Sequence, residues 1–212
     1  MRLVFASNNA HKLSEMREIM PAGIEVLSLR EIGFEQEIEE TGSTLEENSM
    51  IKAEAVCQWL KANGQWSVVD GVFADDTGLE IDALDGAPGI YTARWYMLND
   101  GKDVAEPLHD EMAVYAANRA KALRVLSGHS DRGCQFRTVV TLIRATGERQ
   151  QVAGVVRGEM TRDERGTSGF GYDAIFMPEG YDKTFGELPA EVKNGISHRA
   201  RAMQALIACL QS

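Results

Sequence analysis

The sequence predicts an α/β protein, because segments with the pattern of buried strands alternate with segments of helical periodicity. Residues 3–6 (LVFA) form a short apolar run typical of a buried strand. Leu13, Met16, Ile19 and Met20 follow at helical spacing, so we expect a strand, a loop and a helix at this end of the chain.

Two later segments predict neighbouring strands. Apolar residues alternate with others over residues 134–142, and a turn near 146–148 leads to a second such segment at 151–156. This pattern is a meander and differs from the parallel crossover of a Rossmann fold. A helix is expected before it, at about 112–126, after an acidic surface segment at 97–111.

Two adjacent acids follow the apolar run Val72–Ala74. We interpret Asp75 and Asp76 as carboxylates at the end of a strand, with Thr77 next and a hairpin partner at residues 79–83. Carboxylate oxygens suit magnesium and can accept a proton from water, as phosphoryl or nucleotidyl transfer requires. The alternative is a solvated turn, which the stretch taken alone favours slightly.

The loop after the first predicted strand is a candidate phosphate site. Residues 7–12 (SNNAHK) place hydroxyl, amide and ammonium groups at a helix N-terminus, where free backbone N–H groups favour anions. It is not a Walker loop. The alternative, which the loop alone favours, is ordinary capping by Asn8 or Asn9 with Lys12 in solvent.

A long helix is expected from Leu45 into the low sixties. Thr44 and Glu47 match a capping box, and an apolar stripe follows. Asn48 and Lys52 lie four residues apart and share a different face of this helix, where they would point together. A solvated Lys52 is the alternative.

Two further stretches carry candidate binding groups. In residues 166–173, glycines alternate with Phe170 and Tyr172, which offer aromatic faces for a base, and the stretch ends at the acceptor Asp173; a flexible hairpin is the alternative. Near the chain's end, Ser197 is a good N-cap, which places His198 and Arg199 in a first helical turn. Positive charge there is unfavourable by about 0.3–1 kcal/mol, so Arg199 either meets a ligand or pairs with an acid, and both readings stay open.

Composition limits the class of protein. The 212 residues are 44% hydrophobic and 25% charged, without a linker or repeat, and we expect one domain over 1–212. The net charge of -10, from 22 basic and 32 acidic residues, argues against general binding to nucleic acid. No apolar run is long enough for a signal peptide or a membrane span, so we expect a cytoplasmic protein with no membrane partner.

Five stretches together resemble the inosine triphosphate pyrophosphatase family, which includes the HAM1-like proteins of bacteria. They are SNNAHK (7–12), EETGSTLEENSMIKA (39–53), ADDTGLEIDALDGAPGIYTAR (74–94), GTSGFGYDAIF (166–176) and KNGISHRARA (193–202). They run in the family's order. The resemblance implies an elongated, twisted mixed sheet with helices packed on it, in two lobes around a cleft. It also implies magnesium-dependent conversion of ITP, dITP and XTP to the monophosphate and pyrophosphate, and a homodimer.

The resemblance also assigns roles to residues of this sequence. It implies a metal site at Glu40 and Asp76, and catalysis by Asp76, Asp75 and Lys52. The substrate-binding positions it implies are Ser7, Asn8, Asn9, Ala10, His11, Lys12, Thr77, Phe170, Gly171, Tyr172, Asp173, Lys193, His198 and Arg199. Donors from His198 or Arg199 would pair with the 6-keto group of hypoxanthine or xanthine, and adenine would leave them unpaired, a difference worth up to about 10⁴–10⁵-fold.

Other readings remain open. A related Maf-type pyrophosphatase acts on other nucleotides, but the SHR and FGYD motifs speak against it. A nucleotide sensor without turnover would not need both Glu40 and Asp76. The sequence departs from the family at Ala174, where proline is common, and in extra residues near 63–71 and 97–115. It does not decide which of Asp75 and Asp76 takes the proton, the number of metal ions, or the preference among ITP, dITP and XTP.

Overall fold

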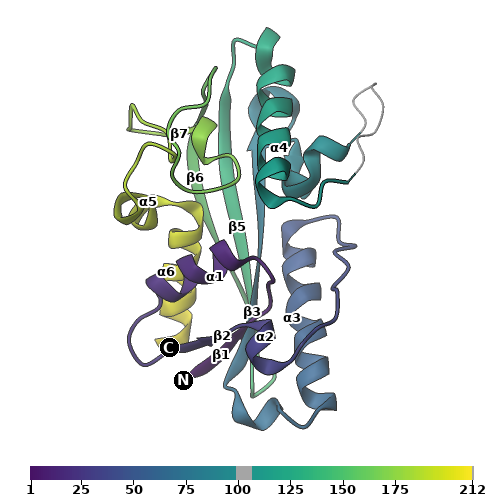
Figure 1. The fold of residues 1–212 in the computed structure, drawn as a ribbon. Helices are drawn as coiled ribbons and strands as arrows, with labels where there is room; N and C mark the ends of the chain where they lie inside the picture. Colours follow the sequence, from purple (N-terminus) through teal and green to yellow (C-terminus); the bar gives the residue numbers. More distant parts are fainter. Residues whose placement is uncertain (99–106, 212) are drawn as a thin grey trace. The chain divides into compact units, whose positions relative to one another are not determined.

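The computed structural model describes residues 1–98 and 107–211, which form strands and helices in alternation (Figure 1). The strands are β1 (Arg2–Phe5), β2 (Glu25–Leu27), β3 (Gly71–Ile81), β4 (Pro88–Gly89), β5 (Gly133–Arg144), β6 (Arg149–Met160) and β7 (Phe176–Pro178). The helices are α1 (Ala10–Ile19), α2 (Leu29–Ile32), α3 (Leu45–Ala62), α4 (Glu111–Val125), α5 (Ala190–Ile196) and α6 (His198–Gln211). Short 3-10 segments lie at Trp66–Val68, Asp82–Leu84, Thr92–Met97, Leu126–Gly128 and Asp173–Ile175.

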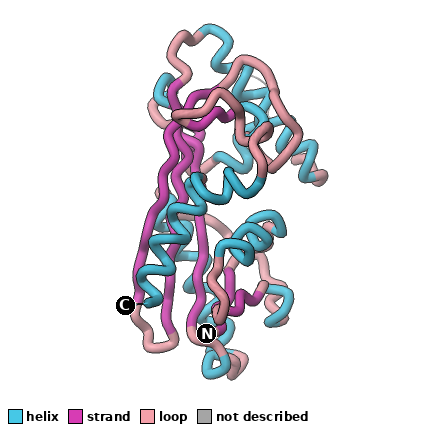
Figure 2. The backbone as a smooth tube through the Cα atoms, turned by 90° about the vertical axis from the view of Figure 1, so that its left-hand side faces the viewer, coloured by secondary structure: helices cyan, strands magenta, loops and turns pink. Residues whose placement is uncertain are grey.

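The strands form one mixed sheet in the order β2-β1-β3-β5-β6-β7, and β4 pairs with β3 outside this path. β1 is parallel to β2 and to β3, whereas β4 and β7 pair antiparallel with β3 and β6. The long strands β5 and β6 follow one another through a short turn, as the alternating pattern predicted (Figure 2). The predicted α/β class with a mixed sheet and flanking helices is confirmed.

The chain divides into two compact units. Unit 1 comprises residues 1–76, 138–155 and 197–212, and unit 2 comprises residues 77–137 and 156–196. Strands β3, β5 and β6 contribute residues to both units, because each of them passes a boundary between these ranges. The single domain over 1–212 and the cleft between two lobes both stay predictions.

Unit 1 has a hydrophobic cluster on each face of its part of the sheet, because successive side chains of a strand point to opposite faces. Leu3, Phe5 and Phe73 pack on one face with Met16 of α1 and Met203 of α6. α1 and α6 lie near each other on that face (Figure 1). The face is therefore closed by helices from the two ends of the described chain.

The opposite face of unit 1 packs against α3. Val4, Val72 and Ala74 form a cluster there with Val56 and Leu60 of that helix. α3 covers residues 45–62 as predicted, and the hydroxyl of Thr44 accepts a hydrogen bond from the Glu47 N–H at 3.1 Å. The Glu47 carboxylate accepts from the backbone N–H of Ser43 at 2.6 Å.

Unit 2 has its own core, which is rich in aromatic side chains. Phe136, Tyr172, Phe176 and Phe185 pack with Trp95 and with apolar residues of β3 and α4. The helix predicted at about 112–126 is confirmed as α4. The predicted surface segment at 97–111 falls partly on residues 99–106, which lie outside the described residues, and so does part of the extra stretch noted near 97–115.

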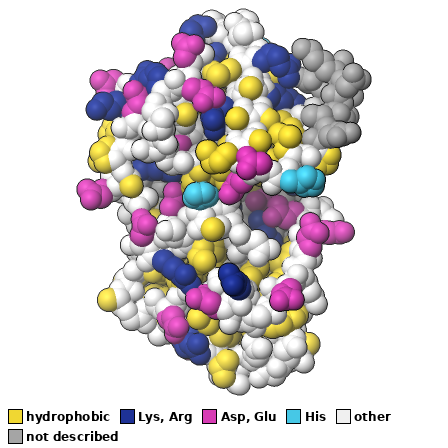
Figure 3. Space-filling view, in the orientation of Figure 1, with side chains coloured by type: hydrophobic (Ala, Val, Ile, Leu, Met, Phe, Trp, Pro, Cys, Tyr) yellow, Lys and Arg dark blue, Asp and Glu magenta, His cyan; other side chains and the backbone are white. Residues whose placement is uncertain are grey.

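On the face drawn in Figure 3, acidic side chains are interspersed with basic ones. Within residues 1–98 and 107–211, no helix has both the length and the apolar character that crossing a membrane would need.

Candidate functional site

The two adjacent acids lie within strand β3, and the prediction that the strand ends at them is wrong. β3 continues from Gly71 through Asp75 and Asp76 to Ile81, so residues 79–81 belong to the same strand and are not a hairpin partner. The local sequence pattern could not show this, because the charges of Asp75 and Asp76 are balanced by basic groups that lie far away in the sequence. Those groups come from the helices of unit 1.

Asp75 points to the face of the sheet that α1 and α6 cover. Its Oδ2 atom lies 2.8 Å from the ammonium of Lys12 on α1 and 3.8 Å from Nε of Arg199 on α6. Burial raises the pKa of the Asp75 carboxyl, but Lys12, Arg199 and Lys52 outweigh burial and lower this pKa to about 2. Asp75 is therefore an ionised anchor for two cations.

Asp76 points to the other face, toward α3. Its Oδ1 accepts a hydrogen bond from Nζ of Lys52 at 3.2 Å, and the same ammonium donates to Glu40 at 2.8 Å. Burial of Asp76 raises its pKa, and the nearby carboxylates of Glu40 and Asp75 add to this, while Lys52 and Lys12 oppose it. Burial lowers the pKa of Lys52, but the three carboxylates outweigh burial and raise it. Lys52 thus holds Glu40 and Asp76 together as a charged pair.

Asn48, one helical turn before Lys52, holds the segment that carries Glu40. Asn48 is fully buried, and its side-chain oxygen accepts a hydrogen bond from the Gly42 N–H at 2.8 Å. A Cβ atom at Gly42 would lie 2.6 Å from that oxygen. The two residues predicted to share a face of α3 are both buried, and Asn48 positions the segment that carries Glu40.

The residues present fit a magnesium ion that completes its shell with substrate and water. Oδ2 of Asp76 is buried and accepts no hydrogen bond within the described part of the chain. Among residues 1–98 and 107–211, no three His, Cys, Asp or Glu side chains converge as a complete metal-binding group. Magnesium commonly binds through one or two carboxylates together with substrate phosphates, and Glu40 and Asp76 supply such a pair.

The SNNAHK loop leads from β1 into α1 in unit 1. The side chain of Asn9 caps α1 by accepting from the Lys12 N–H at 2.9 Å, and the Ser7 hydroxyl accepts from the Asn9 N–H at 3.3 Å. The capping role left open at Asn8 or Asn9 therefore belongs to Asn9, but Lys12 is not in solvent, because it binds Asp75. Asn8, Ala10 and His11 are exposed around the start of the helix.

His198 and Arg199 lie in the first turn of α6, also in unit 1. The Ser197 hydroxyl accepts from the Ala200 N–H at 3.1 Å, which confirms the predicted cap. Arg199 is 2% exposed and donates to the carboxylate of Glu15 on α1. The sequence left pairing with an acid as one reading of Arg199, and in the structure that acid is Glu15, which the sequence analysis did not name. Its position three residues after Lys12, on the same face of α1, was the available signal.

The glycine-rich stretch lies in unit 2 and is a loop held by Asp173. Oδ2 of Asp173 accepts from the Phe170 N–H at 2.8 Å and from the Lys193 ammonium at 2.7 Å. That ammonium also lies 4.9 Å from the centre of the Phe170 ring. Gly169 has φ +75°, and a Cβ atom there would lie 2.0 Å from the Asp173 carboxylate.

The two aromatic residues of this loop differ in exposure. Phe170 is half-buried, whereas Tyr172 is 4% exposed, packs in the core of unit 2 and donates its hydroxyl to the Thr92 carbonyl at 2.8 Å. Burial raises the pKa of the Tyr172 hydroxyl. Of the two rings named from the sequence, that of Phe170 is therefore the one left for stacking. Thr77 is half-buried in β3, at the start of unit 2.

The structure thus groups most of the named residues into two sets. Unit 1 holds Glu40, Lys52, Asp75, Asp76, Lys12, His198 and Arg199 with the SNNAHK loop, and unit 2 holds Thr77, Phe170, Gly171, Tyr172, Asp173 and Lys193. Sequence reasoning missed Thr92, Tyr115 and Arg119, which contact the glycine-rich loop. For Tyr115 and Arg119 the signal was their spacing of four residues on α4.

A family model and two sequence relatives agree with one another over nearly the whole chain. Residues 3–209 match the model of the Ham1 family. The chain is 42% identical over 207 residues to the dITP/XTP pyrophosphatase of Flavobacterium johnsoniae, with 98% of this chain and 96% of that protein covered. It is also 42% identical over 207 residues to the dITP/XTP pyrophosphatase of Porphyromonas gingivalis, with 97% and 95% covered.

Solved structures agree in fold. The Ham1 protein of Staphylococcus aureus matches with a TM-score of 0.80 and 36% identity, covering 100% of this chain and 98% of that chain. A HAM1 protein of Coxiella burnetii also gives a TM-score of 0.80, at 33% identity, with the same coverage. The five stretches of sequence, the mixed sheet and the full-length matches lead to one conclusion: the chain belongs to the Ham1 family.

Proposed function

We propose that this chain is a nucleoside triphosphate pyrophosphatase that hydrolyses dITP, XTP and ITP to the nucleoside monophosphate and pyrophosphate. The relatives named above as dITP/XTP pyrophosphatases support this function over nearly the full chain. The structural observation that supports it best is the pair Glu40 and Asp76, bound to one lysine, with a buried Asp76 oxygen that accepts no hydrogen bond within the described chain. The role of this enzyme is to remove nonstandard purine nucleotides before they enter DNA or RNA.

The residues of unit 1 are assigned to the phosphates. The N-terminus of α1 and the Lys12 ammonium attract phosphate oxygens, and Asp75 holds Lys12 in place. Lys52 adds positive charge beside Glu40 and Asp76. Magnesium, held by Glu40 and Asp76 when bound, would neutralise charge that develops on the leaving pyrophosphate.

Asp76 is assigned as the acceptor of the water proton. Oδ2 of Asp76 accepts no hydrogen bond within the described chain, whereas the Asp75 carboxylate lies against Lys12 and Arg199. The water oxygen forms a bond to the α-phosphorus, its proton passes to Asp76, and the bond from that phosphorus to the bridging oxygen of pyrophosphate breaks. A positioned base of this kind contributes about 10²–10⁴-fold to the rate.

We assign recognition of the purine base to the Phe170 loop and to His198 and Arg199, as the resemblance implies. The Phe170 ring provides a stacking face, and Lys193 and Asp173 fix the loop that carries it. We assign His198 and Arg199 as donors for the 6-keto group, so adenine, with an amino group there, is rejected. The Arg199 guanidinium has five N–H donors, so its bond to Glu15 does not exclude this role. We further propose a homodimer, a cytoplasmic location and a single domain over 1–212, as the resemblance and the composition imply.

The test of this function is pyrophosphate release from six nucleotides in parallel. We expect rapid release from dITP, ITP and XTP with magnesium, little release from ATP, GTP and TTP, and none after EDTA. Restoring magnesium in excess of EDTA should restore activity, which separates metal removal from damage to the protein. Tight ITP binding without turnover would instead support a sensor, and a preference for pyrimidine nucleotides would support the Maf-type reading.

A second test concerns the conformation of the base loop. In Gly169→Ala, the new Cβ atom collides with the Asp173 carboxylate, which must release the Phe170 N–H and Lys193. Hydrogen bonds to charged groups are worth about 1.5–3 kcal/mol, so we expect KM for dITP to rise about ten- to hundredfold. Steady-state kinetics would measure this.

Gly171→Ala is the matched control for that loop variant. Gly171 also has positive φ, at +61°, but a Cβ atom there meets nothing within 4 Å. Its effect should be limited to backbone strain of about 1–2 kcal/mol. Equal KM values for the two variants would show that the Asp173 contacts do not matter.

A further inference from the structure

Hydrogen bonds hold the loop that carries Phe170 at its two ends and at Phe170, but the Gly171 segment is held differently. The Arg165 N–H donates to the Ala174 carbonyl at 2.7 Å, and Asp173 binds the Phe170 N–H as described above. Gly171 lies between these ties with φ +61°, and a Cβ atom there would meet nothing within 4 Å. Gly171 itself therefore has no side-chain packing to hold its peptide, and the nearest packed side chain is that of the next residue, Tyr172.

The Gly171 carbonyl accepts a hydrogen bond from helix α4. Nη1 of Arg119 donates to it at 2.9 Å, and Nε of the same guanidinium lies 3.0 Å from a carboxylate oxygen of Glu164. The Arg119 side chain is 15% exposed, so the hydrogen bond is largely protected from water. Since Glu164 precedes the loop and Gly171 lies near its end, one planar guanidinium holds both ends to α4.

The same face of α4 also contacts the stacking residue. Tyr115 lies four residues before Arg119, its ring centre is 5.9 Å from that of Phe170, and its hydroxyl donates to Glu111. Tyr115 and Arg119 thus lie on one face of α4 and both contact the loop, and Glu111 binds Tyr115 from the preceding turn. All of these residues belong to unit 2.

We propose that Arg119 is a positioning residue for purine binding, which sets the place of the Phe170 ring by holding Gly171 and Glu164 to α4. The inference rests on the proposed function, because it assigns the loop to the base of the substrate. The contacts of Arg119 are with Gly171 and Glu164, which both belong to unit 2. Its loss should therefore weaken binding of nucleotides through the base and leave the chemical step and the phosphate contacts unchanged.

The experiment measures the base and the phosphates separately in Arg119→Ala. The readouts are KM and kcat for dITP, the dissociation constant of the product dIMP by direct titration, and the inhibition constant of pyrophosphate, which has no base. Loss of one charge-assisted hydrogen bond should raise KM and the dIMP dissociation constant about tenfold or more. We expect kcat to change less than about threefold, and pyrophosphate inhibition to stay as in the wild type.

Two companion variants make the result specific to Arg119. Arg119→Lys keeps one donor for Gly171 without the fork that also reaches Glu164, so it should recover part of the lost affinity. Arg124→Ala removes an exposed arginine from the same helix and should match the wild type. If Arg119→Ala does not fold, as judged by circular dichroism, Arg119→Lys carries the test alone, with a dIMP affinity below that of the wild type expected.

Three results would overturn the proposal. They are an unchanged dIMP dissociation constant in both Arg119 variants, an equal loss of pyrophosphate and dIMP binding, and an equal effect of Arg124→Ala. A wild-type protein that binds dIMP but hydrolyses no nucleotide would refute the proposed function instead, and the dIMP titration would still decide the role of Arg119.

Discussion

The Asp76→Asn variant is expected to bind dITP and to lose nearly all turnover, with kcat about 10²–10⁴-fold below the wild type. Asparagine keeps the shape of the side chain and an oxygen toward Lys52, but its amide cannot take a proton from water. It also removes a negative charge from the pair that we assign to magnesium. Pyrophosphate release under single-turnover conditions would give the rate, and equilibrium titration with dITP in EDTA would give the affinity.

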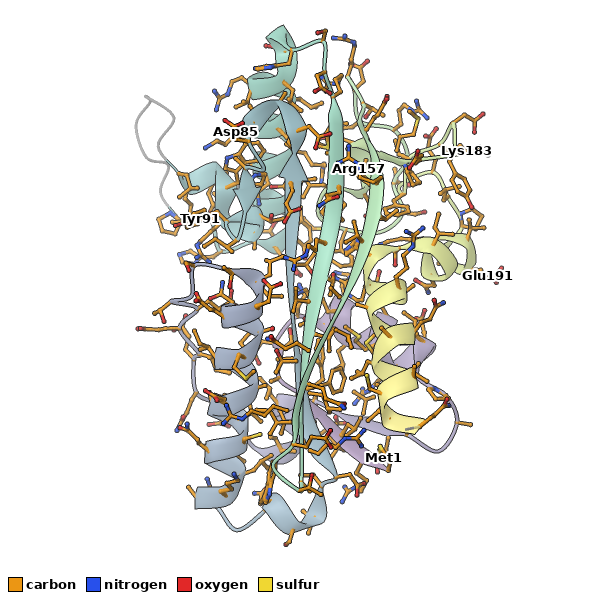
Figure 4. The ribbon with its side chains drawn as sticks, turned by 180° about the vertical axis from the view of Figure 1, so that it is seen from behind. Met1, Asp85, Tyr91, Arg157, Lys183 and Glu191 are labelled. Atoms are coloured by element: carbon orange, nitrogen blue, oxygen red, sulfur yellow. The ribbon has the colours of Figure 1, made fainter. Side chains whose placement is uncertain are left out.

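Asp85→Asn is the matched control for this loss, because it makes the same chemical change at an exposed turn (Figure 4). Asp85 has φ +51°, a conformation that asparagine also adopts readily, so its stability and kcat should equal those of the wild type. Full activity in Asp76→Asn would refute the assignment of Asp76 as the proton acceptor. The parallel variant Asp75→Asn would then be the next one to measure.

Gly154→Ala should destabilise unit 1 by about 1–3 kcal/mol. Gly154 lies on β6 beneath the start of α6, and a Cβ atom there would lie 2.1 Å from the His198 carbonyl oxygen and 2.3 Å from the Ala202 nitrogen. Backbone atoms cannot yield as a flexible side chain does, so α6 must move away from the sheet. Urea unfolding followed by circular dichroism would measure the change, and activity should also fall, because His198 and Arg199 move with the helix.

Gly128→Ala controls for the general effect of replacing a glycine. A Cβ atom at Gly128 meets nothing within 4 Å, and its backbone does not need positive φ. It should be neutral or slightly stabilising, because alanine reduces the freedom of the unfolded chain. If Gly154→Ala unfolded at the same urea concentration as Gly128→Ala, the close packing of α6 on β6 would contribute nothing to stability.

Local sequence patterns predicted the elements whose signals are local. α3 could be placed because Thr44 and the apolar stripe of the helix lie within the same 18-residue segment and its cap. The cap at Ser197 was predicted for the same reason. The mixed α/β class followed from the alternation of strand and helix patterns, together with the resemblance in five stretches.

The partners of charged residues could not be predicted in this way. Asp75 is 63 positions from Lys12, and Arg199 is 184 positions from Glu15. The sequence showed that these side chains needed partners, but pairing depends on which helix covers which face of the sheet. The same gap explains why β3 was expected to end at its acids and why the burial of Tyr172 was not foreseen.

The packing of α6 in unit 1 has a consequence for synthesis on the ribosome. Residues 77–137 and 156–196 of unit 2 are all made before α6, whereas unit 1 needs residues 197–212 to complete it. Until then Leu3, Phe5 and Phe73 lack Met203 and Leu206 as packing partners. The nascent chain therefore carries β1 with one face covered only in part, by α1, until α6 is made.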